Sequence, residues 1–144
     1  MSALTLAAAQ GIVAGALAHA RAGGMKPLAV VVLDEGGHPL AFAREDGASF
    51  GRFDIARAKA NGALAMGADS GVLADRAKGN PVFFHSVSVA LAGGIAFSPG
   101  GVLIRAEGRI VGAVGISGDT GENDEVAARA GIAAMAEHNT TGLA

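Results

Sequence analysis

The chain of 144 residues contains no cysteine, tryptophan or tyrosine, and six phenylalanines are its only aromatic residues. The absence of cysteine excludes disulfide bonds, thiolate metal ligands and cysteine nucleophiles, and the absence of tyrosine excludes phenolic acid–base chemistry. The aromatic residues that most often stack single-stranded nucleic acid are also missing. Only 17% of the residues are charged and the net charge is −2, so we expect no surface for nucleic acid or an anionic membrane.

Small residues take the place of the missing ones, with 33 alanines and 23 glycines among 144 positions. Leucine, isoleucine, valine and phenylalanine together number 36, or 25%, which exceeds the roughly 20% below which chains tend to be disordered. The length fits a single domain over residues 1–144. Because few bulky side chains are available to bury surface, we expect elements or subunits that pack very closely, and hence a homo-oligomer.

The uncharged stretch at residues 3–20 has three interpretations: a signal peptide, a membrane span or a buried helix. It ends in Ala-His-Ala, which resembles a signal-peptidase site, but no lysine or arginine precedes it as a signal peptide requires. Its composition is too weakly apolar for secure insertion into a bilayer, whereas alanine favours helix. Thr5 is suited to cap the helix start, and Gly23 with Gly24 to end it. We therefore predict a buried first helix in a cytoplasmic protein without membrane contact.

The rest of the chain alternates between short apolar runs and stretches with helical spacing. These patterns predict two hairpins, a central helix, shorter helical pieces broken by Gly79 and Pro81, and a final helix. In chain order the predicted elements cover residues 28–33 and 39–44, 53–66, 70–91, 102–105 and 109–117, and 124–138. Strands joined by hairpins point to an antiparallel sheet flanked by helices, which is an α+β fold.

Strict alternation along each strand predicts which side chains share a face of the sheet. In the first hairpin it groups Leu40, Phe42 and Arg44. In the last strand it places Ile110, Gly112, Val114 and Ile116 on one face, and Val111, Ala113, Gly115 and Ser117 on the other. The second of these faces is built of small residues, so it either receives a helix at short range or leaves room for a ligand. The glycines at 112, 115 and 118 have the wrong spacing for a dinucleotide-binding loop, and we interpret them as structural.

The most concentrated polar run in the chain covers residues 117–125. Asp119 and Glu122 fit a capping box, the structural interpretation. Four carboxylates within seven residues exceed what one cap needs, and if they lie together at least one has a raised pKa. The functional interpretation gives Asp119, Glu122 and Asp124 catalytic roles in proton transfer. It assigns Ser117 and Asn123 to ligand binding.

Two cations stand out among apolar or small neighbours: Arg44 at the end of a strand and Lys59 in an alanine-rich helix. They are interpreted either as solvent-facing side chains with apolar stems or as a cationic pair that binds a ligand carboxylate. In the second interpretation Lys59 also belongs to the catalytic group.

Four histidines are present, and none forms a closely spaced pair, so we predict no metal site. His38 lies in a turn and His138 at a helix end. His19 and His85 lie on apolar helical segments, where each is either a packed side chain or an axial ligand to an iron porphyrin.

Several segments taken together resemble one known family. They are, in chain order, Leu4-Thr5, Asp34-x-Gly36-Gly37, Arg44-x-Asp46-Gly47-Ala48, Ile55-Ala-x-x-Lys59-Ala60, Pro99-Gly-Gly101-Val, and Gly108-x-x-Val-Gly112-Ala-Val-Gly115-Ile-Ser117-Gly118 with Asp124. Their order and spacing are similar to those of the GlcG/HbpS-like family, also called the heme-degrading domain and found as the C-terminal domain of PduO-type proteins. The resemblance extends over nearly the whole chain. It implies a profilin-like α+β fold that assembles into dimers or higher oligomers.

The same resemblance implies two alternative functions. Some family members bind heme, in some cases through a histidine of the first helix, which in this chain is His19. Another branch is a lyase that converts a hydroxylaminobenzoate to a catechol acid with release of ammonia. The first hypothesis is therefore a protein that binds heme or a related flat ligand. The second is a cofactor-free lyase or hydrolytic enzyme for a small aromatic or hydroxy acid, with Arg44 and Lys59 binding the carboxylate and residues 119–125 moving protons.

Overall fold

A four-stranded antiparallel sheet forms the centre of the computed structural model, which describes residues 3–142 and the side chains of residues 3–136. The strands are β1 (Ala29–Asp34), β2 (Pro39–Arg44), β3 (Gly101–Ala106) and β4 (Arg109–Ser117), in the order β2-β1-β4-β3. Both predicted hairpins are present, and the predicted α+β class is confirmed. The helices are α1 (Leu6–Ala22), α2 (Gly51–Met66), α3 (Ser70–Gly79), α4 (Pro81–Ala90) and α5 (Gly121–Gly142).

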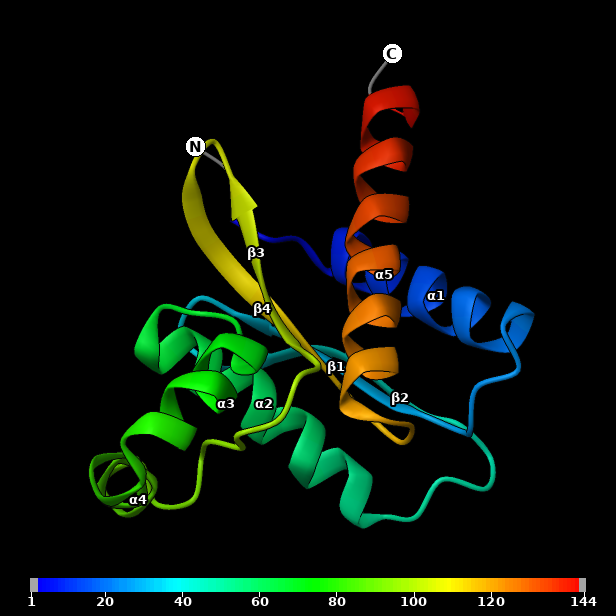
Figure 1. Cartoon of the computed structure of the whole chain (residues 1–144). Coiled ribbons are helices and arrows are strands. Elements are labelled where there is room, and N and C mark those ends of the chain that lie inside the picture. The colour runs from blue at the N-terminus through cyan, green and yellow to red at the C-terminus, as the bar shows by residue number, and fades with distance from the viewer. Residues whose placement is uncertain (1–2, 143–144) are drawn as a thin grey trace.

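Helices cover both faces of the sheet, and Figure 1 shows α1 and α5 crossing on one side with α2, α3 and α4 toward the other. The α1 and α5 helices pack on Val30, Val32, Val114 and Ile116. The α2 helix packs on the opposite face through its alanines, against side chains that include Val31 and Leu33. The β-branched residues of β1 are buried on both faces, which explains why this strand is a continuous apolar run rather than an alternating one.

The first helix has the boundaries that its sequence predicts. The Thr5 hydroxyl accepts a hydrogen bond from the backbone N–H of Ala8 at 3.1 Å, and the helix ends at Gly23, whose N–H donates to the carbonyl of His19. Its buried side chains are alanines and Ile12. Across residues 3–142, no helix combines the length and apolar character needed to cross a membrane.

Glycine and alanine let the helices approach their neighbours very closely. A Cβ atom at Gly15 of α1 would lie 2.7 Å from the Cβ of Ala134 and 3.2 Å from the Cα of Gly131, both in α5. A Cβ atom at Gly115 of β4 would clash with the carbonyl of Ala56 in α2. The small-residue face of β4 therefore receives a helix at short range, which is the first of the two alternatives that the sequence left open.

Two irregularities in strand pairing correct the predicted faces. The register between β3 and β4 shifts between Ile104 and Arg105, so that Val111 is left without an opposing residue. Val111 consequently joins the cluster of α1 and α5, while Ile110 packs on the α2 side, opposite to the prediction. A matching shift in the first hairpin places Leu40 beside Ala41 rather than beside Phe42. A bulge inserts one residue and reverses the faces beyond it.

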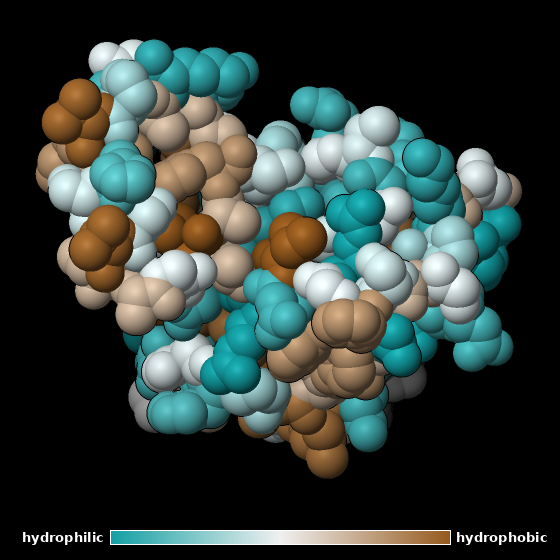
Figure 2. Space-filling view, turned by 90° about the horizontal axis from the view of Figure 1, so that it is seen from below, coloured by the Kyte–Doolittle hydropathy of each residue, from teal (hydrophilic) through white to brown (hydrophobic). Residues whose placement is uncertain are grey.

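The predicted helical pieces over residues 70–91 are two helices, α3 and α4, with Pro81 at the start of the second. They form a small cluster around Leu73, Phe84 and Ile95. The α4 helix contributes little to the main core and exposes Val82, Phe83 and Val89. Figure 2 shows apolar side chains gathered at the left of the molecule, where α4 lies. The expected homo-oligomer stays a prediction.

The closeness of α2 to β4 gives a direct test of the packing. We expect Gly115→Ala to lower the free energy of unfolding by about 1–3 kcal/mol, because its Cβ atom must displace the backbone of Ala56. Gly79→Ala is the matched control, since no atom lies within 4 Å of a Cβ atom built there. Urea denaturation of both variants measures the difference, and equal stabilities would contradict the short helix–sheet distance.

Candidate functional site

An ion pair between Lys59 and Asp124 is enclosed where α2, α5 and the end of β4 meet. The Lys59 ammonium donates to the Asp124 carboxylate at 3.2 Å and to the backbone carbonyl of Ile116 at 2.9 Å. The Lys59 side chain is 3% exposed and that of Asp124 is 1% exposed. The second oxygen of Asp124 accepts a hydrogen bond from the backbone N–H of Asp119 at 3.0 Å. Both charged groups therefore have hydrogen-bond partners inside the protein.

Local sequence explains how a lysine reaches this enclosed position. Lys59 lies on the buried face of α2 with Ala56, Ala60 and Ala63, which are too small to fill the space beside it. The chain passes next to the lysine at Gly100, where a Cβ atom would lie 2.9 Å from the ammonium nitrogen. A side chain at Gly101 would clash with the Lys59 carbonyl. These two glycines, at the start of β3, thus make room for the lysine.

Burial determines the electrostatics of the pair. It lowers the pKa of the Lys59 ammonium below the usual 10.5, and the charge of Asp124 opposes this shift. Burial also raises the pKa of Asp124 above 3.8, and the charge of Lys59 and the N–H of Asp119 oppose that shift. Each charge is costly to remove from water and is retained because its partner is present. Both groups are enclosed and bonded to each other, although the sequence assigned catalytic roles to both.

Asp119 organises the loop before α5. Its carboxylate accepts hydrogen bonds from the backbone N–H of Lys26 at 2.8 Å, from the N–H of Thr120 at 2.7 Å and from the Asn123 side chain at 2.8 Å. These three donors hold the pKa of Asp119 at about 2. A carboxyl group with such a low pKa stays ionised near neutrality, so it carries no proton to donate there and is a weak base.

The capping box predicted for Asp119 and Glu122 is absent. Thr120 caps α5 instead: its hydroxyl accepts from the N–H of Asn123 at 3.2 Å, and its carbonyl accepts from the N–H of Asp124. Asp119 is unavailable for this role because its carboxylate binds the segment before β1. Glu122 and Asn123 are exposed on the first turn of α5.

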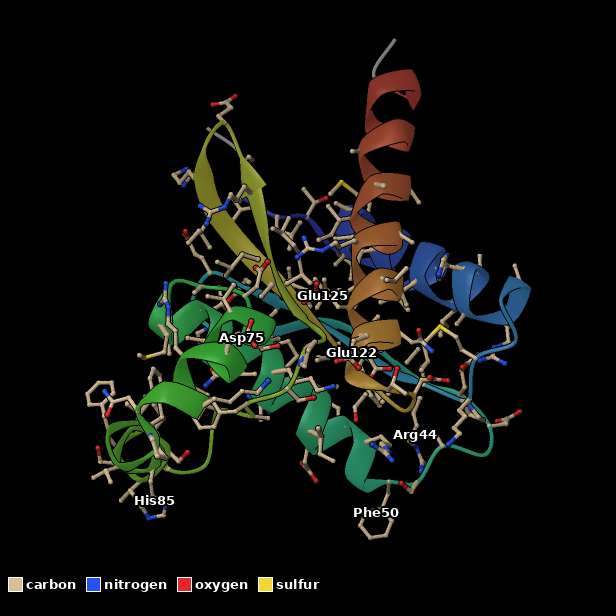
Figure 3. All side chains as sticks on the ribbon, viewed as in Figure 1. Arg44, Phe50, Asp75, His85, Glu122 and Glu125 are labelled. Carbon is tan, nitrogen blue, oxygen red and sulfur yellow. The ribbon has the colours of Figure 1, made fainter. Side chains whose placement is uncertain are left out.

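Arg44 and Ser117 lie at the same end of the sheet, because both pair with Ala29 of the central strand β1. The predicted clamp of Arg44 with Lys59 is nevertheless not formed, since Lys59 points into the protein. The Arg44 guanidinium is bonded to the carbonyl of Ala48 at 3.0 Å. Ser117 is buried and accepts a hydrogen bond from Arg52 of α2 at 3.2 Å, a residue that sequence reasoning did not identify. Figure 3 shows Arg44 on β2, apart from Glu122 and Glu125 on α5.

The histidines are dispersed over the fold. His19 is exposed in the last turn of α1, and His85 is exposed on α4. His38 lies in the first hairpin turn with its Nδ1 atom 3.4 Å from the Asp34 carboxylate. The side chain of His138 lies outside the described residues. Of these four, His19 is on the first helix, where the family resemblance locates a heme ligand.

The fold and this site define a small α+β domain whose helices are joined through a buried lysine–aspartate pair. A model of the family described as "Haem degrading protein HbpS-like" matches residues 4–133. The chain therefore belongs to the HbpS-like family. The comparison with curated protein sequences gave no significant match.

Solved structures agree with this assignment. A double mutant of HbpS from Streptomyces reticuli is 33% identical, with 92% of this chain and 87% of that chain covered and a TM-score of 0.80. The protein ORFY from Klebsiella pneumoniae is 25% identical over 94% and 92% of the two chains, with a TM-score of 0.86. A structure described as a PduOC:heme complex is 26% identical over 92% and 95%, with a TM-score of 0.83.

The buried pair is expected to stabilise one arrangement of the helices. We expect Lys59→Met to lower the free energy of unfolding by about 3–5 kcal/mol, because it leaves the Asp124 carboxylate buried without a counter-charge. The double variant with Asp124→Asn should lose less than the sum of the single losses. Urea denaturation of all three variants completes the double-mutant cycle.

The exposed pair of Lys78 and Asp75 supplies the control for this cycle, since its side chains are 81% and 80% exposed. Lys78→Met should leave the stability unchanged. Strictly additive losses for Lys59 and Asp124 would show that the two side chains are not coupled.

The low pKa of Asp119 predicts how stability depends on pH. A carboxyl with a pKa of 3.8 when unfolded and about 2 when folded stabilises the folded state above pH 4, and this contribution disappears as the pH falls to about 2. Asp119→Asn should therefore be less stable than the parent at pH 7 and equally stable near pH 2. Thermal unfolding over this range measures the difference, and a gap that stays constant would refute the assignment.

Proposed function

We propose that this protein binds heme, with the imidazole of His19 as the axial ligand of the iron. The observation that carries the proposal is the position of His19: its imidazole is exposed on the first helix and has no hydrogen-bond or ion-pair partner among the described residues. A ligating imidazole needs a free ring nitrogen, and an unpartnered side chain provides one. Bound heme would supply an iron centre, for which histidine is a common protein ligand.

The helix face that carries His19 is built of small residues. Residues three and four positions apart share a face of a helix, and His19 shares its face with Gly11, Gly15 and Ala22. The α5 helix covers this face at Gly15, where a Cβ atom would lie 2.7 Å from the Cβ of Ala134. His19 lies one turn further along α1 and is exposed, so its imidazole is open to a ligand from the solvent side.

The comparisons support the class of ligand. The matching family is described as haem degrading, and one similar structure is described as a complex with heme. That structure covers 92% of this chain with a TM-score of 0.83, so most of the fold is shared with it. The assignment of His19 as the ligand is our own inference from its exposure and its place on α1.

The lyase hypothesis has less support in the geometry. Proton transfer to a substrate requires a side-chain atom within hydrogen-bond distance of it. Lys59 and Asp124 are enclosed and bonded to each other, and the low pKa of Asp119 leaves this carboxylate without a proton near neutrality and makes it a weak base. The cations that the sequence paired for substrate binding point in different directions. Heme binding is therefore the function that we favour.

A hemin titration tests the role of His19. We expect wild-type protein to give a saturable Soret shift, and His19→Ala to weaken hemin binding at least tenfold, about 1.4 kcal/mol. His85→Ala is the matched control, because this histidine is also exposed but lies on α4. Retention of the full shift by His19→Ala would exclude the proposed ligand, and the absence of a saturable shift in the wild type would exclude heme binding itself.

A further inference from the structure

A groove of about 700 Å³ lies between α3, β3 and α5, on a part of the surface that α1 does not reach. Its volume falls within the roughly 300–1,000 Å³ that is usual for small-molecule sites. The residues that line it come from three segments far apart in the sequence, which lie within residues 67–76, 102–105 and 129–136. The groove exists only when these three elements are assembled.

The groove combines an apolar surface with an excess of positive charge. Val72, Ile132 and Ala133 contribute apolar side chains, and Val72 is 43% exposed although it is a valine. The charged side chains of the lining are three arginines and one aspartate. The lining therefore carries a net positive charge, although the net charge of the whole chain is −2. An apolar surface with positive charge at its rim is complementary to a molecule with an apolar body and an anionic end.

The three arginines differ in what holds them. Arg129 is bonded to Asp69 at 3.0 Å and to Glu125 at 3.4 Å, so its charge is already matched. The other oxygen of Asp69 accepts from the backbone N–H of Leu103 at 2.9 Å, which fixes this pair against β3. Arg76 and Arg105 have no hydrogen-bond or ion-pair partner among the described residues. Two guanidinium groups are therefore free to bind an anion.

We propose that this groove binds an amphiphilic anion, with an aromatic or aliphatic body against Val72 and Ile132 and a carboxylate held by Arg76 and Arg105. Guanidinium groups suit this task because their planar fork matches the two oxygens of a carboxylate. No residue of α1 lines the groove, so the site is separate from His19. The proposal therefore goes beyond heme binding and does not depend on it.

The sequence did not indicate this groove, although it did indicate that cationic side chains bind a carboxylate. A cationic clamp for a carboxylate was predicted at Arg44 and Lys59, but Lys59 is enclosed with Asp124. The arginines of the groove lie on a helix, a strand and another helix that the fold brings together. Because each of them is an ordinary exposed arginine in its own segment, no local pattern marks it.

Isothermal titration with 2-naphthoate tests the proposal, and 2-naphthamide is the neutral probe with the same ring system. We expect 2-naphthoate to bind the wild-type protein at least tenfold more tightly than 2-naphthamide. The double variant Arg76→Gln with Arg105→Gln should remove this preference. Higher ionic strength should weaken the binding of 2-naphthoate only, because exposed charges are screened by salt.

Two further variants make the test specific to the groove. Arg57→Gln removes an exposed arginine of α2 that does not line the groove, and it should bind 2-naphthoate like the wild type. Ala133→Phe places a ring into the groove at an exposed position and should weaken both probes. Circular dichroism and urea denaturation establish that each variant is folded. His19→Ala should leave 2-naphthoate binding unchanged, which separates this proposal from heme binding.

The remaining outcomes overturn the proposal. If 2-naphthoate gives no heat of binding, or binds the double arginine variant as tightly as the wild type, the groove is not an anion site. Equal affinity for the acid and the amide would show that the arginines do not contribute. Displacement of 2-naphthoate by hemin in the wild type would show that the two ligands share one site, contrary to the separation inferred from the lining residues.

Discussion

The contact on which the structure depends most is the hydrogen-bonded group formed by Lys59, Asp124 and the carbonyl of Ile116. It joins α2 from one face of the sheet to α5 from the other, at the end of the strand between them. A buried charge without its partner is strongly destabilising, so arrangements that separate the two helices are excluded by several kcal/mol. The pair need not add much net stability to have this effect, because it selects one geometry among many compact ones.

Small residues make that geometry possible. Gly100 and Gly101 leave space for the lysine, and Gly115 lets the backbone of Ala56 approach β4 directly. The abundance of alanine and glycine is thus explained by short distances between helices and sheet. It also accounts for the scarcity of bulky side chains, since a core with helices this close to the strands has little volume to fill.

Prediction from the sequence succeeded where a feature depends on neighbours in the chain. The apolar runs, the turn at Asp34 to His38 and the cap at Thr5 each contain the residues that define them. It failed at the bulges near Leu40 and Val111, because alternation shows the period of a strand but not the position at which pairing skips a residue. The sequence placed the cap of α5 at Asp119 rather than at Thr120. The backbone N–H that binds the Asp119 carboxylate instead belongs to Lys26, which is 93 residues away in the chain and so is not visible in the local pattern.

The candidate site shows the same limit more clearly. Lys59 and Asp124 were both selected as unusual, and the structure does bring them together. Their selection rested on residue type, and nothing in their own segments showed that they would be enclosed. Arg52 and the three arginines of the groove were not selected at all. Chemical character is visible in a sequence, whereas exposure and proximity depend on contacts between distant segments.

The distance between Lys59 and Asp124 along the chain also has a consequence for biosynthesis. The two residues are 65 positions apart, and at roughly 5–20 residues per second the ribosome adds the aspartate several seconds after the lysine. During that interval the strands of the first hairpin and α2 have already been synthesised. The Asp124 carboxylate, which pairs with the Lys59 ammonium when it is buried, has not. Lys59 therefore stays hydrated until α5 emerges from the ribosome, and the packing of α2 around this residue is completed only after the last helix has been made.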